Sequence, residues 1–225
     1  IARTSAAPRR AQATATPTAT LPSAGLQGQQ DLLSLVNRLD EMPWNAEQFS
    51  LVNTIDSAYW RLGSNTPGEA DVITVTLPAD LLESFFGNNA ATRIRRVEVE
   101  MALTTYEPSL LDSDDVYFGV LLTEADNPAQ TAGMHIQLVQ PGVINLAQRS
   151  GDQTQTVSQR AVNAVVIRAR LERDPASGAI TLFFNGEQIG GAIQFVSPDA
   201  AVLPTLYVKS PGVIVSVTGW SVTLR

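Results

Sequence analysis

Two segments of the chain alternate between apolar and polar residues. In 94–103, Val97, Val99 and Met101 share one face, and the same period of two returns in 165–172. Successive side chains of a strand point to opposite faces of a sheet, so this alternation is typical of a strand with one buried face. Both segments are therefore predicted to be strands that pack against a hydrophobic core.

Further short segments with the pattern of a strand occur along the whole chain after residue 57. The predicted strands are 58–62, 72–77, 94–105, 116–123, 133–140, 143–149, 162–172, 179–184, 188–195, 204–208 and 213–224. Turn residues separate them, and hairpins are predicted at Pro141-Gly142, Asp174 to Gly178, Asn185-Gly186 and Pro211-Gly212. A short helical turn is expected within Pro78–Asn89, over one end of the core. This arrangement predicts an all-β sandwich or jelly roll rather than a βαβ sheet.

The N-terminal region has a different composition. Residues 1–25 are rich in Thr, Pro and Ala, have few large apolar side chains, and predict a low-complexity linker or arm. An inert spacer and an arm that orders against a neighbouring subunit both remain open. Leu32, Leu35 and Leu39 at helical spacing predict an amphipathic helix over 26–43, and residues 44–225 are predicted to form one β-sandwich domain.

The charge and cysteine content exclude several classes of function. The net charge is −7, and charged residues make up 16% of the chain. Nucleic-acid binding needs a concentrated basic surface, so we expect no nucleic-acid partner. With no cysteine, the chain has no disulfide, thiolate metal site or cysteine nucleophile. It has no apolar stretch long enough for a transmembrane segment.

We expect the domain to lie outside the cell or on its surface. Its strands are rich in neutral polar residues, and the absence of cysteine fits an extracellular bacterial protein. The chain starts at Ile1 rather than at a methionine, so an upstream signal peptide or anchor is expected to have been removed.

A hairpin late in the chain carries a family resemblance. Ala164–Arg173 is followed by a turn, by Ile180–Gly190 with Asn185-Gly186 inside it, and by a closing strand with Trp220. This pattern resembles the concanavalin A-like lectin/glucanase superfamily, which includes laminin-G-like and related bacterial sugar-associated domains. The resemblance implies a concanavalin A-like jelly-roll β-sandwich, and it suggests carbohydrate binding.

The resemblance does not extend to a catalytic motif. Glucanases of this superfamily carry Glu, Asp and Glu at alternating positions, whereas Glu98-Val99-Glu100 lacks the third carboxylate and follows two arginines. A retaining glycosidase needs two facing carboxyls, one of them protonated. A neighbouring arginine such as Arg96 would keep a glutamate ionised. We therefore expect that the protein is not an enzyme.

Charged residues are predicted to form a ladder across two strands. Arg96, Glu98 and Glu100 share a face of one predicted strand, and Arg168, Arg170 and Glu172 share a face of another. If the two strands are neighbours, opposite charges lie across from each other. The ladder is either a solvated sheet face or a surface that binds sugar hydroxyls or a partner.

Two further groups of residues are weighed as sites. His135 is the sole histidine and is expected, with Gln137, on the face opposite to Met134 and Ile136. His135 and Tyr117 could add hydrogen bonds and ring stacking to a ligand site formed by the ladder. The acidic loop with Asp112, Asp114 and Asp115 offers hard oxygen ligands for calcium, or is an ordinary turn. No other cofactor is expected.

Three functions follow from these observations. The first is a non-catalytic extracellular recognition domain that binds a glycan or a cell-envelope component. The second is a structural subunit of a surface assembly, in which the N-terminal arm contacts copies of the same chain. The third is a weak glycoside hydrolase.

Overall fold

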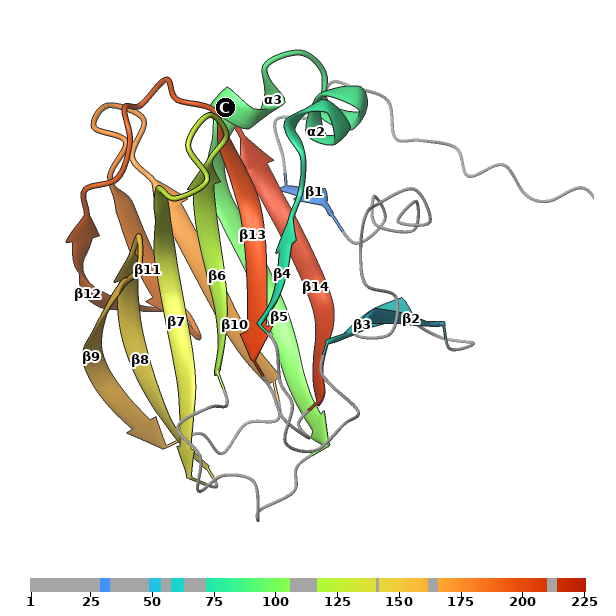
Figure 1. Cartoon of the computed structure of the whole chain (residues 1–225), viewed down its shortest axis with the longest axis vertical. Coiled ribbons are helices and arrows are strands. Elements are labelled where there is room, and N and C mark those ends of the chain that lie inside the picture. The colour runs from blue at the N-terminus through green and yellow to red at the C-terminus, as the bar shows by residue number, and fades with distance from the viewer. Residues whose placement is uncertain are drawn as a thin grey trace, which may run out of the picture.

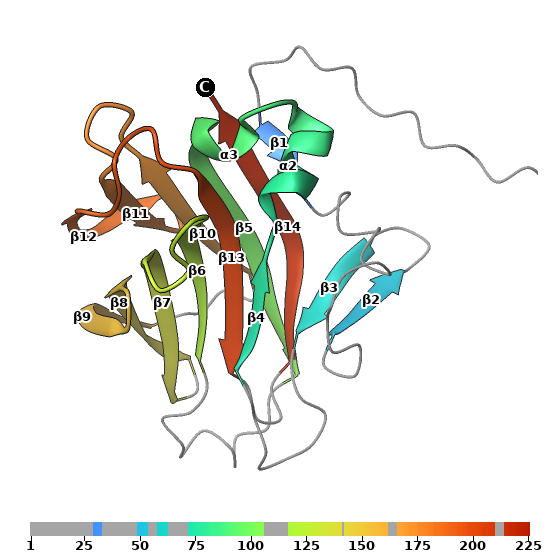
Figure 2. The same ribbon diagram turned by 45° about the horizontal axis from the view of Figure 1, so that its top comes forward.

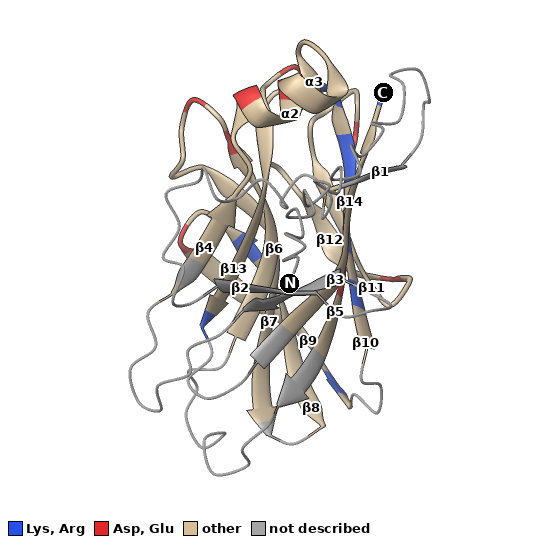
Figure 3. Ribbon diagram, turned by 90° about the vertical axis from the view of Figure 1, so that its right-hand side faces the viewer, with Lys and Arg blue, Asp and Glu red and all other residues tan. Residues whose placement is uncertain are grey.

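Strands dominate the chain and form two antiparallel sheets. The computed structural model describes residues 29–32, 49–53, 58–62, 72–105, 117–140, 142–161, 166–209 and 214–225. Within them, one sheet has the order β12-β11-β10-β5-β14-β3-β2, with β1 beside β14, and the other has the order β4-β13-β6-β7-β8-β9. The eight-stranded and six-stranded sheets lie face to face as two layers (Figure 1, Figure 3).

The chain alternates between the two layers. The eight-stranded sheet consists of β1 (Gln29–Asp31), β2 (Phe49–Asn53), β3 (Ala58–Leu62), β5 (Ile94–Thr105), β10 (Val166–Arg173), β11 (Ile180–Phe184), β12 (Glu187–Ile193) and β14 (Ile214–Leu224). The six-stranded sheet consists of β4 (Ile73–Thr76), β6 (Tyr117–Glu124), β7 (Thr131–Gln140), β8 (Val143–Ser150), β9 (Gln153–Ala161) and β13 (Val202–Lys209). The repeated crossing between sheets makes the fold a jelly-roll sandwich, as predicted.

The core lies between the sheets because alternate residues of each strand point inward. On β5 the inward residues Val97 and Val99 are fully buried, and Phe118 and Val120 of β6 belong to the same buried cluster. Trp220 on β14 is 1% exposed and is among the largest buried side chains. Burying this much apolar surface is the main force that holds the two sheets together.

One end of the sandwich is closed by two short helices. The helices α2 (Ala79–Phe86) and α3 (Ala90–Arg93) connect β4 at the edge of one sheet to β5 inside the other. Leu82 of α2 is fully buried, so the helix covers the end of the core (Figure 1, Figure 2). The chain ends beside α3, where the Arg225 N–H donates to the Arg93 carbonyl at 2.9 Å. No helix in the described part of the chain is long and apolar enough to cross a membrane.

Two predictions were wrong in part. Within the predicted helix 26–43, Gln29–Asp31 form the strand β1, which pairs with β14, and the Leu32 N–H donates to the Trp220 carbonyl. Backbone hydrogen bonds to the edge of the sheet therefore decide the conformation of Gln29–Asp31, although the apolar residues of this segment are spaced as in a helix. The remaining residues of 26–43, and the arm 1–25, lie outside the described residues. The predicted hairpin at Pro211-Gly212 lies outside the described residues, but the strands on either side of it, β13 and β14, belong to different sheets and do not pair with each other.

Besides β1, two strands were not predicted. The strand β9 has the sequence QTQTVSQRA, in which Val157 is the one large apolar residue, so it carries almost no hydrophobic pattern. It forms because β8 offers its backbone as a partner along the whole strand. The short strand β2 pairs with β3 in the same way, at the edge of the other sheet.

Candidate functional site

The structure divides the predicted ligand residues between the two outer faces of the sandwich. Arg96, Glu98 and Glu100 lie on the eight-stranded sheet with the arginines of β10. Tyr117, His135 and Gln137 lie on β6 and β7 of the six-stranded sheet. The prediction that Tyr117 and His135 belong to the same site as the ladder is therefore wrong, because a hydrophobic core separates the two groups.

The predicted charge ladder is present. The strands β5 and β10 are antiparallel neighbours, and their register places Arg168 opposite Glu100, Arg170 opposite Glu98, and Glu172 opposite Arg96. The Arg168 Nε lies 2.8 Å from the Glu100 Oε2, and the Arg96 Nη2 lies 2.8 Å from the Glu172 Oε1. The hydrogen bond from Arg168 lowers the pKa of Glu100, so this carboxylate is not available as a protonated general acid.

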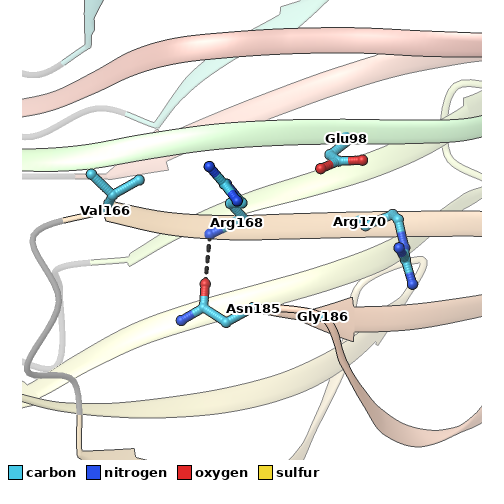
Figure 4. Close-up of a pocket in the computed structure, with 6 residues that line it drawn as sticks. All are labelled: Glu98, Val166, Arg168, Arg170, Asn185 and Gly186. Atoms are coloured by element: carbon cyan, nitrogen blue, oxygen red, sulfur yellow. Dashed lines mark hydrogen bonds between the residues drawn. The ribbon is translucent and has the colours of Figure 1, made fainter. Parts of the chain in front are cut away.

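The middle row of the ladder is open. The Arg170 guanidinium lies 4.0 Å from the centre of the Phe183 ring instead of meeting Glu98. A pocket of about 500 Å³ lies beside it, lined by Glu98, Val166, Arg168, Arg170, Asn185 and Gly186 (Figure 4). Figure 4 shows the Glu98 and Arg170 side chains directed away from each other. It also shows the hydrogen bond from the backbone N–H of Arg168 to the side-chain oxygen of Asn185.

The six-stranded sheet carries an aromatic cluster on its outer face. Tyr207, Gly119 and His135 lie in one row across β13, β6 and β7. Gly119 has no side chain, so the Tyr207 ring lies over it and its hydroxyl reaches the His135 Nδ1 at 2.6 Å; a Cβ at position 119 would overlap that ring. The Tyr117 ring completes the cluster, with its centroid 4.9 Å from that of His135.

A single arginine side chain lies over this cluster. The Arg149 guanidinium is 4.9 Å from the centre of the Tyr207 ring, a distance that allows a cation–π interaction. Its Nε donates to the Gly151 carbonyl at 3.0 Å, and its contact with the fully exposed Asp152 is 3.9 Å long. A contact of that length to a solvated carboxylate is weak, so most of the positive charge of Arg149 remains available to a ligand.

The environment keeps both titratable groups of the cluster neutral. Burial, and then the charge of Arg149, lower the pKa of His135 to about 4. Burial raises the pKa of Tyr207 to about 12, although Arg149 opposes that shift. The Tyr207 hydroxyl and the His135 Nδ1 share a hydrogen bond of 2.6 Å, and the tautomer of the neutral imidazole decides which of the two donates. In the tautomer whose Nδ1 accepts from Tyr207, the His135 Nε2–H is a hydrogen-bond donor.

Beside the cluster, the outer face is hollowed. The hollow has a volume of about 400 Å³, and its lining includes Arg149 and Tyr207 at one side and Glu124 at another. Three threonine hydroxyls form a chain of hydrogen bonds across its floor. The Thr205 hydroxyl lies 3.0 Å from the Thr76 hydroxyl and 2.8 Å from the Thr123 hydroxyl. Apolar side chains from Val72, Leu121, Pro128 and Leu203 surround these hydroxyls. Such a mixture of apolar walls and a few polar groups is typical of small-molecule sites.

Sequence reasoning missed three residues of this site. Gly119, Arg149 and Tyr207 were not proposed, although Tyr207 alternates with the buried Leu206 and Val208. That alternation predicts a strand at β13, but it does not show which residues of the neighbouring strands its outward side chains contact. Gln137 is on the predicted face, opposite Tyr117 in the register. The calcium candidates Asp112, Asp114 and Asp115 lie outside the described residues.

Comparison with known proteins identifies the fold. No protein-family model matches the sequence, and no curated protein sequence matches it either. The structure is similar to that of an alginate lyase from Pseudomonas aeruginosa, with a TM-score of 0.52 and 12% identity over 81% of this chain and 88% of the lyase. It is also similar to part of a GH43 glycoside hydrolase with endo-xylanase and exo-arabinofuranosidase activity, with a TM-score of 0.53 and 12% identity over 81% of this chain and 37% of that one.

A bifunctional GH43 enzyme from Bacteroides eggerthii is a further structural neighbour. Its TM-score is 0.52 and its identity 11%, over 79% of this chain and 24% of the enzyme. At such low identity these likenesses establish the fold, the concanavalin A-like jelly-roll sandwich, and not the activity.

Proposed function

We propose that this domain binds an acidic polysaccharide along the outer face of its six-stranded sheet, without cleaving it. The observation that carries the proposal is the position of Arg149 and His135 beside a hollow lined by threonine hydroxyls. A sugar ring has hydroxyls at its edge and C–H groups on its faces, which suits threonines set among Leu121, Leu203 and Val72. The similarity to an alginate lyase supports the choice of an acidic polymer, since alginate is built from sugar carboxylates.

The donors of the cluster favour a carboxylate. Arg149 presents a guanidinium, which matches the planar geometry of a carboxylate. In the tautomer whose Nδ1 accepts from Tyr207, the His135 Nε2–H adds a neutral donor. The Tyr117 ring is half-buried and extends the surface along β6, on which residues 117–123 span roughly 20 Å. That length accommodates several linked sugar rings rather than a single one.

The protonation states support binding rather than catalysis. An efficient general acid or base has a pKa near the working pH. The shifts move His135 and Tyr207 in the other direction, to about 4 and about 12, so neither exchanges a proton readily near neutral pH. Among the described residues that line the hollow, Glu124 is the one carboxylate, whereas a retaining or inverting glycosidase uses two.

The location belongs to the same proposal. A polysaccharide partner, whether free or part of a cell envelope, is reached most simply by a domain outside the cell or on its surface. The absence of cysteine fits that location, because no thiol is exposed to oxidation.

Titration calorimetry with defined oligosaccharides tests the proposal. Oligomers of a polyuronate are expected to bind, and neutral β-glucan oligomers of equal length to bind weakly. Arg149→Gln is expected to weaken uronate binding by about 10- to 100-fold, the effect of removing a charged hydrogen bond. The control Arg168→Gln removes an arginine from the opposite face and is expected to leave binding unchanged. Equal losses in both variants, or no uronate binding at all, would contradict the proposal.

A second assay tests the absence of catalysis. Elimination from a uronate removes the proton next to the carboxylate and expels the neighbouring sugar oxygen, which leaves a conjugated double bond in the product. We expect no rise in ultraviolet absorbance when the protein is incubated with polyuronate. A rise that Tyr207→Phe abolishes would make His135 and Tyr207 catalytic residues instead.

A further inference from the structure

The charge ladder on the eight-stranded sheet is complementary to itself. Each of its three rows joins a negative residue on one strand to a positive residue on the other: Arg96 with Glu172, Glu98 with Arg170, and Glu100 with Arg168. Consider a twofold axis that runs between β5 and β10 and parallel to them. In a face-to-face pair about this axis, β5 of one copy lies over β10 of its partner, row by row. Every charge then meets an opposite charge.

In the middle row, Glu98 can accept a contact from a second copy. Within the described part of the chain, Glu98 forms no ion pair and lines an open pocket of about 500 Å³. Arg170 lies over the Phe183 ring, and its Nε forms an ion pair with Glu172 at 3.4 Å but no hydrogen bond. A partner's arginine can therefore reach Glu98 without first displacing an ion pair (Figure 4).

The ladder is also accessible. The side chains of Arg168 and Arg96 are 64% and 43% exposed, and Val166 beside the pocket is 41% exposed. A stable interface buries about 800 Å² on each partner, more than two strands provide. The contact must therefore extend to neighbouring outward residues, which include Thr181 and Phe183 on β11 and Thr218 and Thr223 on β14.

We propose that this face is an interface between two copies of the chain, related by a twofold axis between β5 and β10. The sheets of the two copies then stack face to face, as sheets do within a sandwich. The interface leaves the six-stranded sheet uncovered, so the inference does not rest on the proposed glycan site. Because its contacts are largely ionic, the dimer dissociates as salt concentration rises.

A charge-swap experiment tests the interface in the full chain. The molecular mass is measured by sedimentation equilibrium at low salt for the unchanged protein, for Glu98→Lys, for Arg170→Glu, and for an equimolar mixture of the two variants. Residue 98 of each copy faces residue 170 of the other, so a homodimer of either variant contains this pair twice with two like charges. We expect its dissociation constant to rise by at least about 100-fold. In the mixture, the introduced lysine faces the introduced glutamate, and the unchanged Arg170 faces the unchanged Glu98, so the dimer returns.

Two further variants keep the test decisive. Glu187→Lys breaks the Arg160–Glu187 pair at the β9–β12 edge, away from the ladder, and is expected to leave the dimer intact. If a charge reversal impairs folding, Glu98→Gln removes the charge without repulsion and is expected to weaken the dimer by about tenfold. A monomer at every concentration, a dimer in each single variant, or a mixture that stays monomeric overturns the proposal.

Discussion

On the outer face of the eight-stranded sheet, rows of opposite charges stand side by side in solvent. On the outer face of the six-stranded sheet, Arg149 lies over the Tyr207 ring, beside a histidine that stays neutral. The two faces belong to one sandwich and share one core, yet their electrostatics differ. Charges that neutralise each other leave a surface suited to an equally balanced partner, whereas a cation with weak counter-charges attracts an anion.

The faces also differ in how firmly their side chains are held. Tyr207 is 2% exposed, and its ring fits over Gly119 so closely that a Cβ at position 119 would overlap it. Arg168, in contrast, is mostly exposed although it is ion-paired. A preorganised site loses little conformational entropy on binding, so the six-stranded face is the better candidate for a specific small ligand.

The largest effect is expected where this packing is tightest. Gly119→Ala places a methyl group against the Tyr207 ring, and overpacking of this kind costs about 1–3 kcal/mol of unfolding free energy. The matched control is Gly191→Ala on β12, where the added Cβ meets open space and the change should stay within about 0.5 kcal/mol. Urea denaturation of both variants measures the difference. Equal stabilities would show that the Tyr207 ring is not held over Gly119.

Removal of one hydroxyl is expected to have the next largest effect. Tyr207→Phe keeps the ring but leaves the His135 Nδ1 without its hydrogen-bond partner, at a cost of about 1–2 kcal/mol. On the other face, Thr218→Val removes an exposed hydroxyl that bonds Glu100, and we expect no measurable loss. Both comparisons use urea denaturation at neutral pH. A larger loss for Thr218→Val would reverse the order of rigidity that we assign to the two faces.

The neutral histidine predicts a pH effect of known sign. The folded-state pKa of His135 is lowered to about 4, below its ordinary value near 6.5, so the unfolded chain binds this proton more readily. Its contribution to stability is therefore complete above about pH 6.5 and is lost as the pH falls toward 4. His135 is the sole histidine, so its ring signals in an NMR titration are unambiguous. A midpoint near 6.5 would mean that the ring is solvated and not part of a closed cluster.

The smallest effect is expected from the ladder. Arg168→Gln breaks the ion pair with Glu100, but the guanidinium is mostly exposed, and such pairs contribute little to folding. We expect an unchanged urea midpoint for the dilute protein. A clear destabilisation would indicate that the ladder stabilises the fold of the single chain, and not only contacts between copies.

The same contrast explains how much the sequence could predict. The alternation around Val97 and in 165–172 determines which residues of β5 and β10 point outward, so the ladder followed once the two strands were taken as neighbours. The aromatic cluster depends on which strands adjoin β6 and on the register of Tyr207, Gly119 and His135 across three strands. Alternation within a strand holds no information about register, so Tyr207 and Arg149 could not be placed.

The hydrophobic pattern of the sequence did not predict the strands that form by backbone pairing with the edge of a sheet. The strand β9 has little hydrophobic signal, and Gln29–Asp31 lie in a segment with helical spacing, yet both add to the edge of an existing strand. Edge strands need only a neighbouring backbone and can tolerate polar side chains on both faces. Asn185-Gly186, in contrast, was predicted correctly because a tight turn with positive φ at both residues requires such a pair.

On our proposal the six-stranded face, and not the ladder, binds an acidic glycan. The most direct measurement follows the His135 ring signals by NMR while a short oligouronate is added. We predict that these signals shift progressively and saturate, that a neutral oligoglucan leaves them unchanged, and that Arg149→Gln suppresses the shift. Saturable uronate binding in calorimetry with unmoved His135 signals would place the ligand elsewhere on the molecule and contradict the account.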